Sequence, residues 1–140
     1  MKQAMYHTLL GASVFVMCIA VPTTGWSHHS FAAEFDGANA ITVQGVVTEI
    51  KWTNPHTWFY LETKDDSGTV VSWGFEGGTP TGLIRNGIKR DFLKIGDKVT
   101  MKGFRARDLS KTYGAVREII LADGRSFTVG PSDAIDHKVN

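Results

Sequence analysis

Short apolar runs alternate with glycine, aspartate and asparagine from residue 41 onward, at intervals of about ten residues, as is typical of a small barrel or sandwich. The first run, ITVQGVVTEIKW, places Val43 and Val47 on one parity and Ile50 and Trp52 on the other. One extra residue at a β-bulge would return both pairs to the same face. The run therefore predicts a bent strand with a bulge within residues 45–48.

The second run, HTWFYLET, carries two alternating sets of side chains along one strand. Phe59 and Leu61 share one face, which we expect to be the inner one. His56, Trp58 and Tyr60 share the other face. Because both faces carry large apolar groups, we expect both to have a role.

An Asp-Asp-Ser-Gly turn, a third strand, a short helix and two further strands follow. In the segment TPTGLIRNG, Thr79 is a candidate N-cap and Pro80 stands at the first helical position. We expect this helix to bury Leu83 and Ile84. The last strand is expected from Ala115 onward, with a short extension after the next turn.

This order of elements predicts an all-β fold, namely an OB-like five-stranded Greek-key β-barrel over residues 41–130 with one short capping helix between strands three and four. An SH3-like barrel or a small sandwich stays open, because the order of strands along the chain does not fix their pairing. The predicted core consists of Val43, Val47, Phe59, Leu61, Val71, Trp73, Leu83, Val99 and Ile119.

The first 27 residues have the layout of a secretory signal peptide, with Lys2, an apolar segment at 9–21 and then small and turn-forming residues. The apolar segment is shorter than the roughly 20 residues that a membrane-spanning helix needs. We therefore expect cleavage after residue 27 and no stable membrane anchor afterwards. The alternatives are an uncleaved anchor and a cut at another position such as Gly25. The mature chain would be periplasmic or secreted, with an N-terminal segment at 28–40 and a polar tail at 131–140.

Charge and cysteine content narrow the class of protein further. Cys18, the single cysteine, lies in the leader, so the mature chain can form no disulfide. Loss of Lys2 takes the basic residues from 15 to 14, which equals the 14 acidic residues. Nucleic-acid binding draws on a basic excess, so we expect no nucleic-acid partner.

Four segments carry a family resemblance: HHSFAAEFD, VVTEIKWTNPH, RNGIKRDFLKIGDKVTMKG and REIILADGRSF. Together they resemble the bacterial exported family designated domain of unknown function 6152, and they cover nearly the whole mature chain. The resemblance implies a small secreted or periplasmic β protein and no particular activity.

Catalytic motifs are missing from the sequence. It has no Gly-x-Ser-x-Gly elbow, no His-Glu-x-x-His pair, no phosphate-binding Gly-Lys-Ser/Thr loop and, after cleavage, no cysteine nucleophile. Glu34, Asp36, Glu62 and Glu76 are isolated along the chain, and we expect them to be solvated. We therefore predict a non-enzymatic protein.

The candidate surface for a small ligand or an exported protein partner comprises Asn54, His56, Trp58 and Tyr60. Two interpretations of its rings stay open. They either pack under an N-terminal segment anchored by Phe31 and Phe35, which we favour, or form an exposed platform of the kind on which OB barrels stack ligands. Pro55 and Asn54 are expected to shape the preceding turn, and His56 either hydrogen-bonds at the strand start or reaches outward.

Histidines at the cleavage point offer a second function. Cleavage after residue 27 would leave His28 with both a free amine and an imidazole, next to His29. Nitrogen ligands in a near-planar arrangement suit Cu(II), and imidazole-rich sites also suit Zn(II). The arrangement resembles the copper-binding histidine brace, with His29 or His56 as the further ligand. The alternative is an exposed linker that binds no metal.

The leader generates the first testable prediction. The intact mass of the exported product should correspond to loss of residues 1–27, with His28 as the amino-terminal residue. A mature product that keeps Met1 would overturn both the signal-peptide assignment and the amine ligand.

Overall fold

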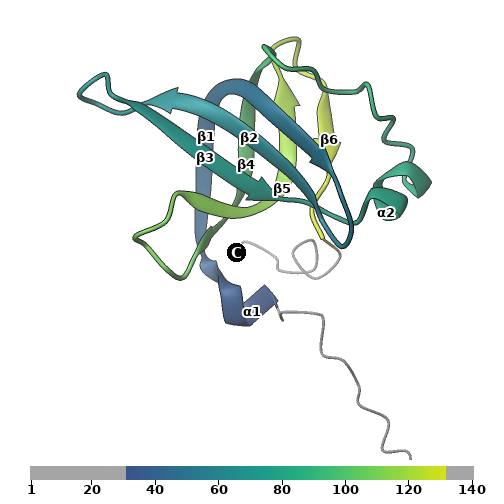
Figure 1. Ribbon diagram of the computed structural model, residues 1–140, viewed down its shortest axis with the longest axis horizontal. Coiled ribbons are helices and arrows are strands. Elements are labelled where there is room, and N and C mark those ends of the chain that lie inside the picture. The colour runs from purple at the N-terminus through teal and green to yellow at the C-terminus, as the bar shows by residue number, and fades with distance from the viewer. Residues whose placement is uncertain (1–30, 132–140) are drawn as a thin grey trace, which may run out of the picture.

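The computed structural model describes residues 31–131, which are mostly β-structure, as the sequence predicts. Six strands belong to one sheet (Figure 1). They are β1 (Phe35–Trp52), β2 (Thr57–Lys64), β3 (Val70–Glu76), β4 (Lys98–Ala106), β5 (Tyr113–Leu121) and β6 (Ser126–Thr128). Two short helices are α1 (Phe31–Glu34) and α2 (Pro80–Arg85).

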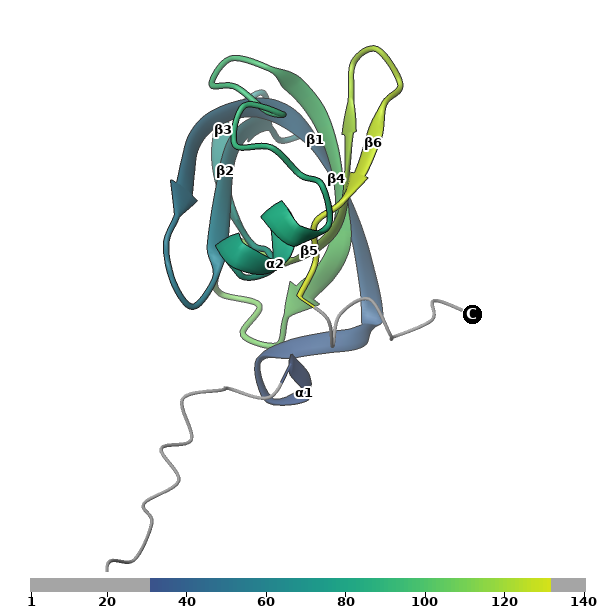
Figure 2. The same ribbon diagram turned by 90° about the vertical axis from the view of Figure 1, so that its right-hand side faces the viewer.

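The strands follow the order β3-β2-β1-β4-β5-β6, and β3 additionally pairs with β5. The β3–β5 pairing is parallel, whereas all the pairs of neighbours in this order are antiparallel. The sheet is strongly curled, with β2 and β3 opposite β4 and β5, and α2 lies across one end of it (Figure 2). No helix within residues 31–131 is long and apolar enough to cross a membrane.

The strand β1 bends so that one strand serves two partners. Its first part pairs with β4 and its second part with β2. The register with β2 shifts between Val47 and Glu49, which confirms the predicted bulge. Beyond the bulge Ile50 pairs with Phe59 and packs against the same core as Val47. The bulge therefore keeps both halves of β1 facing one core despite their opposite parity.

Two features of β1 extend the sequence prediction. Gly45 lies against β2, and a Cβ at this position would overlap the carbonyl of Glu62. The strand also begins at Phe35 rather than at Ile41, because Phe35 already pairs with Ala106 of β4. The register between β1 and β4 is irregular between Phe35 and Ala40. Part of the expected N-terminal segment is thus integral to the sheet.

The main core agrees with the predicted core at most positions. Val47, Phe59, Leu61, Leu83, Val99 and Ile119 are buried. Val43 and Trp73 are only half-buried and pack against the core from its margin. Val71 is half-buried as well and lies outside the core, so its predicted place there is wrong. Val71 and Trp73 precede the stretch of β3 that pairs with β5, so that part of the strand has one neighbour instead of two. Arg105 covers the exposed side of Trp73, with its guanidinium 4.9 Å from the ring centroid.

Helix α2 forms where the sequence predicts it, with one side chain placed differently. The Thr79 hydroxyl accepts a hydrogen bond from the Gly82 N–H at 3.0 Å, which confirms the N-cap. Leu83 is buried as expected, but the expectation for Ile84 is wrong, since its side chain is 50% exposed. Successive residues of a helix point about 100° apart, so a helix this short buries only one of the two. Ile88, just beyond the helix, joins the core instead.

Candidate functional site

The outer face of the sheet, opposite the main core, carries the predicted binding residues of β2. Phe59 and Leu61 are fully buried in the core. Because side chains alternate along a strand, the intervening Trp58 and Tyr60 project to the outer face, and both are half-buried. The alternation that the sequence predicts for β2 is therefore confirmed.

Neighbouring strands contribute further groups to this face. Tyr60 pairs with Gly74 of β3, and Gly74 pairs in turn with Tyr113 of β5. Residues paired across strands share a face. The centroids of Trp58 and Tyr60 lie 6.2 Å apart with nearly parallel planes, and Tyr113 lies 6.3 Å from Trp58. We call Trp58, Tyr60 and Tyr113 the aromatic patch.

Gly74 gives the aromatic patch its shape. A Cβ at this position would lie 3.2 Å from a ring carbon of Tyr60 and 3.8 Å from one of Trp58. Both rings therefore lean across β3, over a position that has no side chain. A larger residue would push the Tyr60 ring away from the sheet.

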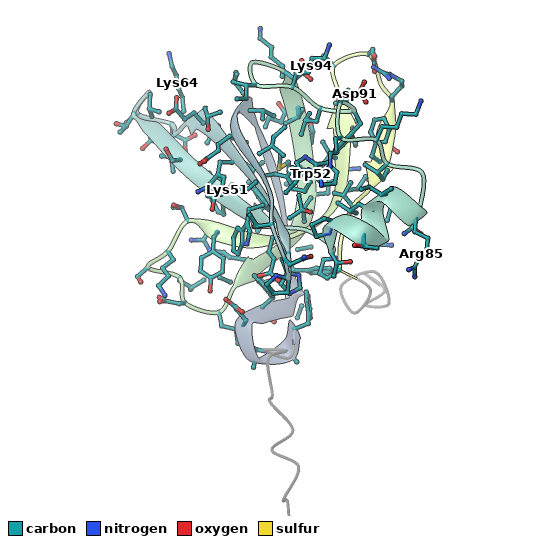
Figure 3. The ribbon with its side chains drawn as sticks, turned by 45° about the vertical axis from the view of Figure 1, so that its right-hand side comes forward. Lys51, Trp52, Lys64, Arg85, Asp91 and Lys94 are labelled. Carbon is teal, nitrogen blue, oxygen red and sulfur yellow. The ribbon has the colours of Figure 1, made fainter. Side chains whose placement is uncertain are left out.

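A lysine flanks the patch on the β1 side. The ammonium of Lys51 lies 4.7 Å from the centroid of Tyr60 and 3.3 Å from the Glu49 carboxylate. The hydrogen bond with Glu49 raises the pKa of Lys51, and the Tyr60 phenol adds to the effect. Figure 3 shows Lys51 and its chain neighbour Trp52 on different sides of the ribbon, as the alternation along β1 requires. The cation thus belongs to the outer face.

His56 and Glu76 form a polar pair beside Trp58. The Nδ1 atom of His56 lies 3.2 Å from the Glu76 Oε1 atom and 3.2 Å from the Gly77 carbonyl oxygen. A carbonyl oxygen can only accept, so Nδ1 carries the proton and donates. In the neutral ring the lone pair is then on Nε2. Glu76 is 8% exposed, so the expectation that this carboxylate is solvated is wrong.

The N-terminal segment packs beside the aromatic patch and not over it. Phe31, Phe35 and Phe104 form a second apolar cluster on β4 and β5, together with Ala106 and Ala115. Phe35 contacts Tyr113 with a centroid distance of 5.8 Å, and Tyr113 contacts Trp58. Tyr113 therefore stands between the N-terminal phenylalanines and Trp58. Each of the two interpretations of the patch describes part of this arrangement.

Helix α1 is tied to the loop between β4 and β5. The Nε atom of Arg107 donates to the Ala32 carbonyl at 2.7 Å, and its backbone N–H donates to the Glu34 carbonyl at 2.9 Å. The Tyr113 hydroxyl donates to the Glu34 carboxylate at 2.9 Å. Burial, followed by this hydrogen bond, raises the pKa of Tyr113 to about 12. The phenol accordingly stays a neutral donor throughout the physiological range.

The turn before β2 differs from its expected chemistry. The Thr53 hydroxyl donates to the His56 carbonyl at 3.3 Å, whereas the exposed Asn54 side chain makes no hydrogen bond within residues 31–131. The peptide bond between Asn54 and Pro55 is cis. Asn54 therefore lies next to the candidate site, and its side chain takes part in none of the hydrogen bonds of that site.

The metal-binding hypothesis involves His56, which lies within residues 31–131, and two histidines that lie outside this range. His28 and His29 lie outside the described residues, and so does His137. Within residues 31–131 no group of three histidine, cysteine, aspartate or glutamate side chains is arranged to hold a metal ion. His56 has a carboxylate and a carbonyl as its polar neighbours there.

Comparison with protein families shows which family this chain belongs to. The model of a family of unknown function, DUF6152, matches residues 15–115. The chain belongs to DUF6152. That match spans α1, all of β1 to β4 and each member of the aromatic patch. Comparisons with curated proteins and with solved structures found no significant match.

Several groups on this face of the DUF6152 chain escape prediction from sequence alone. Tyr113 reaches Trp58 through the parallel β3–β5 pairing, which leaves no periodic signal in the sequence. Gly74 and Glu76 come beside Tyr60 and Trp58 through the register of β2 with β3. Glu34 joins through α1. The one available signal was Gly74 itself, a glycine within an otherwise bulky strand, which often marks a close approach by another group.

The hydrogen bond between Tyr113 and Glu34 gives a prediction for stability. A pKa raised above its unfolded value contributes stability that is full below the unfolded pKa and declines as pH rises toward the folded one. We therefore expect the wild type to lose stability between the usual tyrosine pKa near 10 and about 12. Tyr113→Phe should be less stable by about 1 kcal/mol near neutral pH and should lack that part of the alkaline decline.

Urea unfolding of wild type and Tyr113→Phe from neutral pH up to about pH 12 measures both effects. Tyr60→Phe is the matched control, because it removes a phenol that does not donate to Glu34. An alkaline decline that is unchanged in Tyr113→Phe would contradict the assignment.

Proposed function

We propose that the sheet of this DUF6152 protein is a closed OB-like barrel. The support is the cycle of hydrogen-bonded neighbours, which runs β1–β2–β3–β5–β4 and returns to β1. This is the pairing expected of a five-stranded Greek-key barrel, and α2 stands between strands three and four as in OB folds. The strand β6 extends the edge beyond β5.

We further propose that the barrel is a non-enzymatic accessory module that binds a small ligand or an exported protein partner through the aromatic patch. One observation carries this proposal: three large rings lie together on the outer face and belong to neither buried cluster, although Tyr113 packs against the smaller one. Half-exposed tryptophan and tyrosine side chains are the residues that most often dominate binding surfaces. The same face of OB barrels is a common ligand platform.

The polar groups around the aromatic patch would orient a bound molecule. Lys51 lies on one side, and the His56–Glu76 pair lies beside Trp58. The carboxylate and the imidazole bind each other through Nδ1, so the pair is a fixed polar feature at the margin of an apolar surface. This arrangement matches an apolar contact area bordered by polar groups, as interfaces have. The proposal assigns no catalytic step to it.

We propose a periplasmic or secreted location on the strength of the leader pattern in residues 1–27. An exported partner or a small periplasmic ligand is therefore the expected binding species. The near balance of acidic and basic residues again argues against nucleic acid.

Removal of two rings tests the binding module. Trp58→Ala combined with Tyr60→Ala should weaken capture of the bound species from a periplasmic extract by at least about tenfold, since central aromatic residues contribute about 2 kcal/mol or more to binding. The measurement is quantitative pull-down with the mature protein, followed by titration with the purified species.

Ile84→Ala is the matched control, because Ile84 is a 50% exposed apolar residue on α2 and not on the outer face of β2 and β3. It should leave capture unchanged. Equal capture by the double variant, with its fold verified by circular dichroism, would remove the patch as the binding surface.

A second candidate function, binding of Cu(II) or more weakly Zn(II), rests on the geometry of His56. Metal-bound histidines commonly donate one ring N–H to a carboxylate or carbonyl and ligate through the other nitrogen. In His56 the Nδ1 atom is held by Glu76 and the Gly77 carbonyl, which leaves Nε2 to act as the ligand. The amine and imidazole of His28, with His29, would complete the site.

Copper titration of correctly processed protein tests this candidate. We expect His28→Ala and His56→Ala each to weaken Cu(II) binding, whereas His137→Ala in the C-terminal tail should not. Binding should also weaken as pH falls through the imidazole range, because protons compete with the metal for nitrogen. Equal Cu(II) affinity in all four proteins would eliminate the metal function and leave the binding module untouched.

A further inference from the structure

A half-open hollow lies at the end of the sheet where α2 leads into β4, apart from the aromatic patch. Its volume is about 560 Å³, and it is lined by the loop after α2 and by the β5–β6 hairpin. This volume lies within the range of about 300 to 1,000 Å³ that is usual for ligand sites in proteins. None of the patch residues lines it.

One part of the wall of the hollow is apolar. Phe92 and Phe127 meet edge to face there, with centroids 5.0 Å apart, and both rings are half-buried. Leu121 is the third apolar member and is buried at the base of the hairpin. An edge-to-face pair leaves ring surface on which a further flat group can pack.

The exposed margin of the hollow is cationic. Lys89, Lys94 and Lys98 line it, and all three are exposed. None of their ammonium groups forms an ion pair or hydrogen bond with another residue described in the structure. Figure 3 shows Lys94 projecting from the loop near Asp91, well away from Lys64 on the β2–β3 hairpin.

Two of the three carboxylates in the lining already have partners within it. Asp123 accepts from the backbone N–H and Nε of Arg125 at 3.0 and 2.8 Å. Asp97 accepts from the backbone N–H of Lys94 at 2.9 Å. Asp91 makes no such contact in the described part of the chain. Counting Arg125, the lining holds four cations and three carboxylates, so its surplus is one positive charge.

We propose that this hollow binds a small organic anion with one negative charge and a flat apolar body, such as an aromatic monocarboxylate. The body would pack on Phe92 and Phe127, and the carboxylate would lie among the three unpaired lysines. The inference is independent of the aromatic patch, because it uses other residues at another place on the sheet.

Three probes that share one ring separate the two parts of the proposal: phenylacetate, 2-phenylethanol and 2-phenylethylammonium. Titration of the ¹⁵N-labelled full-length mature protein should move amide signals of residues 87–98 and 121–127. Phenylacetate should bind most tightly, the alcohol more weakly and the ammonium most weakly. Phenylacetate affinity should fall as salt is raised, because the charges are exposed and screened.

Charge variants assign the effect to the hollow. Lys94→Gln with Lys98→Gln should weaken phenylacetate binding by about three- to tenfold, since each exposed charge contributes modestly. Asp91→Asn should strengthen it by about twofold. Lys64→Gln with Arg85→Gln is the matched control, because it removes the same net charge outside the lining and should change nothing.

Phe127→Leu tests the apolar wall while keeping an apolar residue there. It should weaken all three probes alike, by about twofold or more. Equal affinity for phenylacetate and the alcohol would overturn the proposal. An equal loss of phenylacetate affinity in the lysine double variant and in the lysine–arginine control would overturn it too. Signal changes confined to the aromatic patch would do so as well and would favour the proposed function instead.

Discussion

The bulge in β1 is the constraint on which the arrangement of both faces depends. Without the extra residue between Val47 and Glu49, Ile50 and Trp52 would leave the core and their neighbours would enter it. The register beyond the bulge also fixes β2, since Lys51 pairs with Trp58 and Ile50 with Phe59. One local irregularity thus determines which rings of β2 are buried and which remain on the outside.

The aromatic patch is held in place by packing that continues from the N-terminal helix. Ring contacts run from Phe31 to Phe35, on to Tyr113, and then to Trp58 and Tyr60, with successive centroids 5.4, 5.8, 6.3 and 6.2 Å apart. Rings fixed in this way lose little freedom when a ligand covers them, so less of the binding free energy is spent on ordering the surface. Anchoring of α1 and exposure of the patch are therefore compatible.

Sequence periodicity was informative wherever structure is local. The alternation in β2, the bulge in β1 and the Thr79 cap all follow from neighbouring residues, and each is present. Burial of Ile84 was wrong, and Trp73 lies at the margin of the core, because these features depend on which side of α2 faces the core and on how far β5 extends along β3.

The candidate site was only half predictable for the same reason. His56, Trp58 and Tyr60 share one strand, so their common face could be inferred from spacing. Tyr113 and Glu34 reach that face from strands and helices distant in sequence. Glu76 looked like one more solvated carboxylate until its pairing with Trp58 and its contact with His56 placed it at the site.

The parallel contact between β3 and β5 spans only three residue pairs, from Gly74 with Tyr113 to Glu76 with Ala115. Amide exchange reveals that native proteins open locally, and that regions with few stabilising contacts open first. This seam runs directly beneath the aromatic patch, with Trp58 on one side and Tyr113 on the other. A bound molecule that contacts both rings would bridge the seam, and its occupancy would slow exchange of the amides there by mass action.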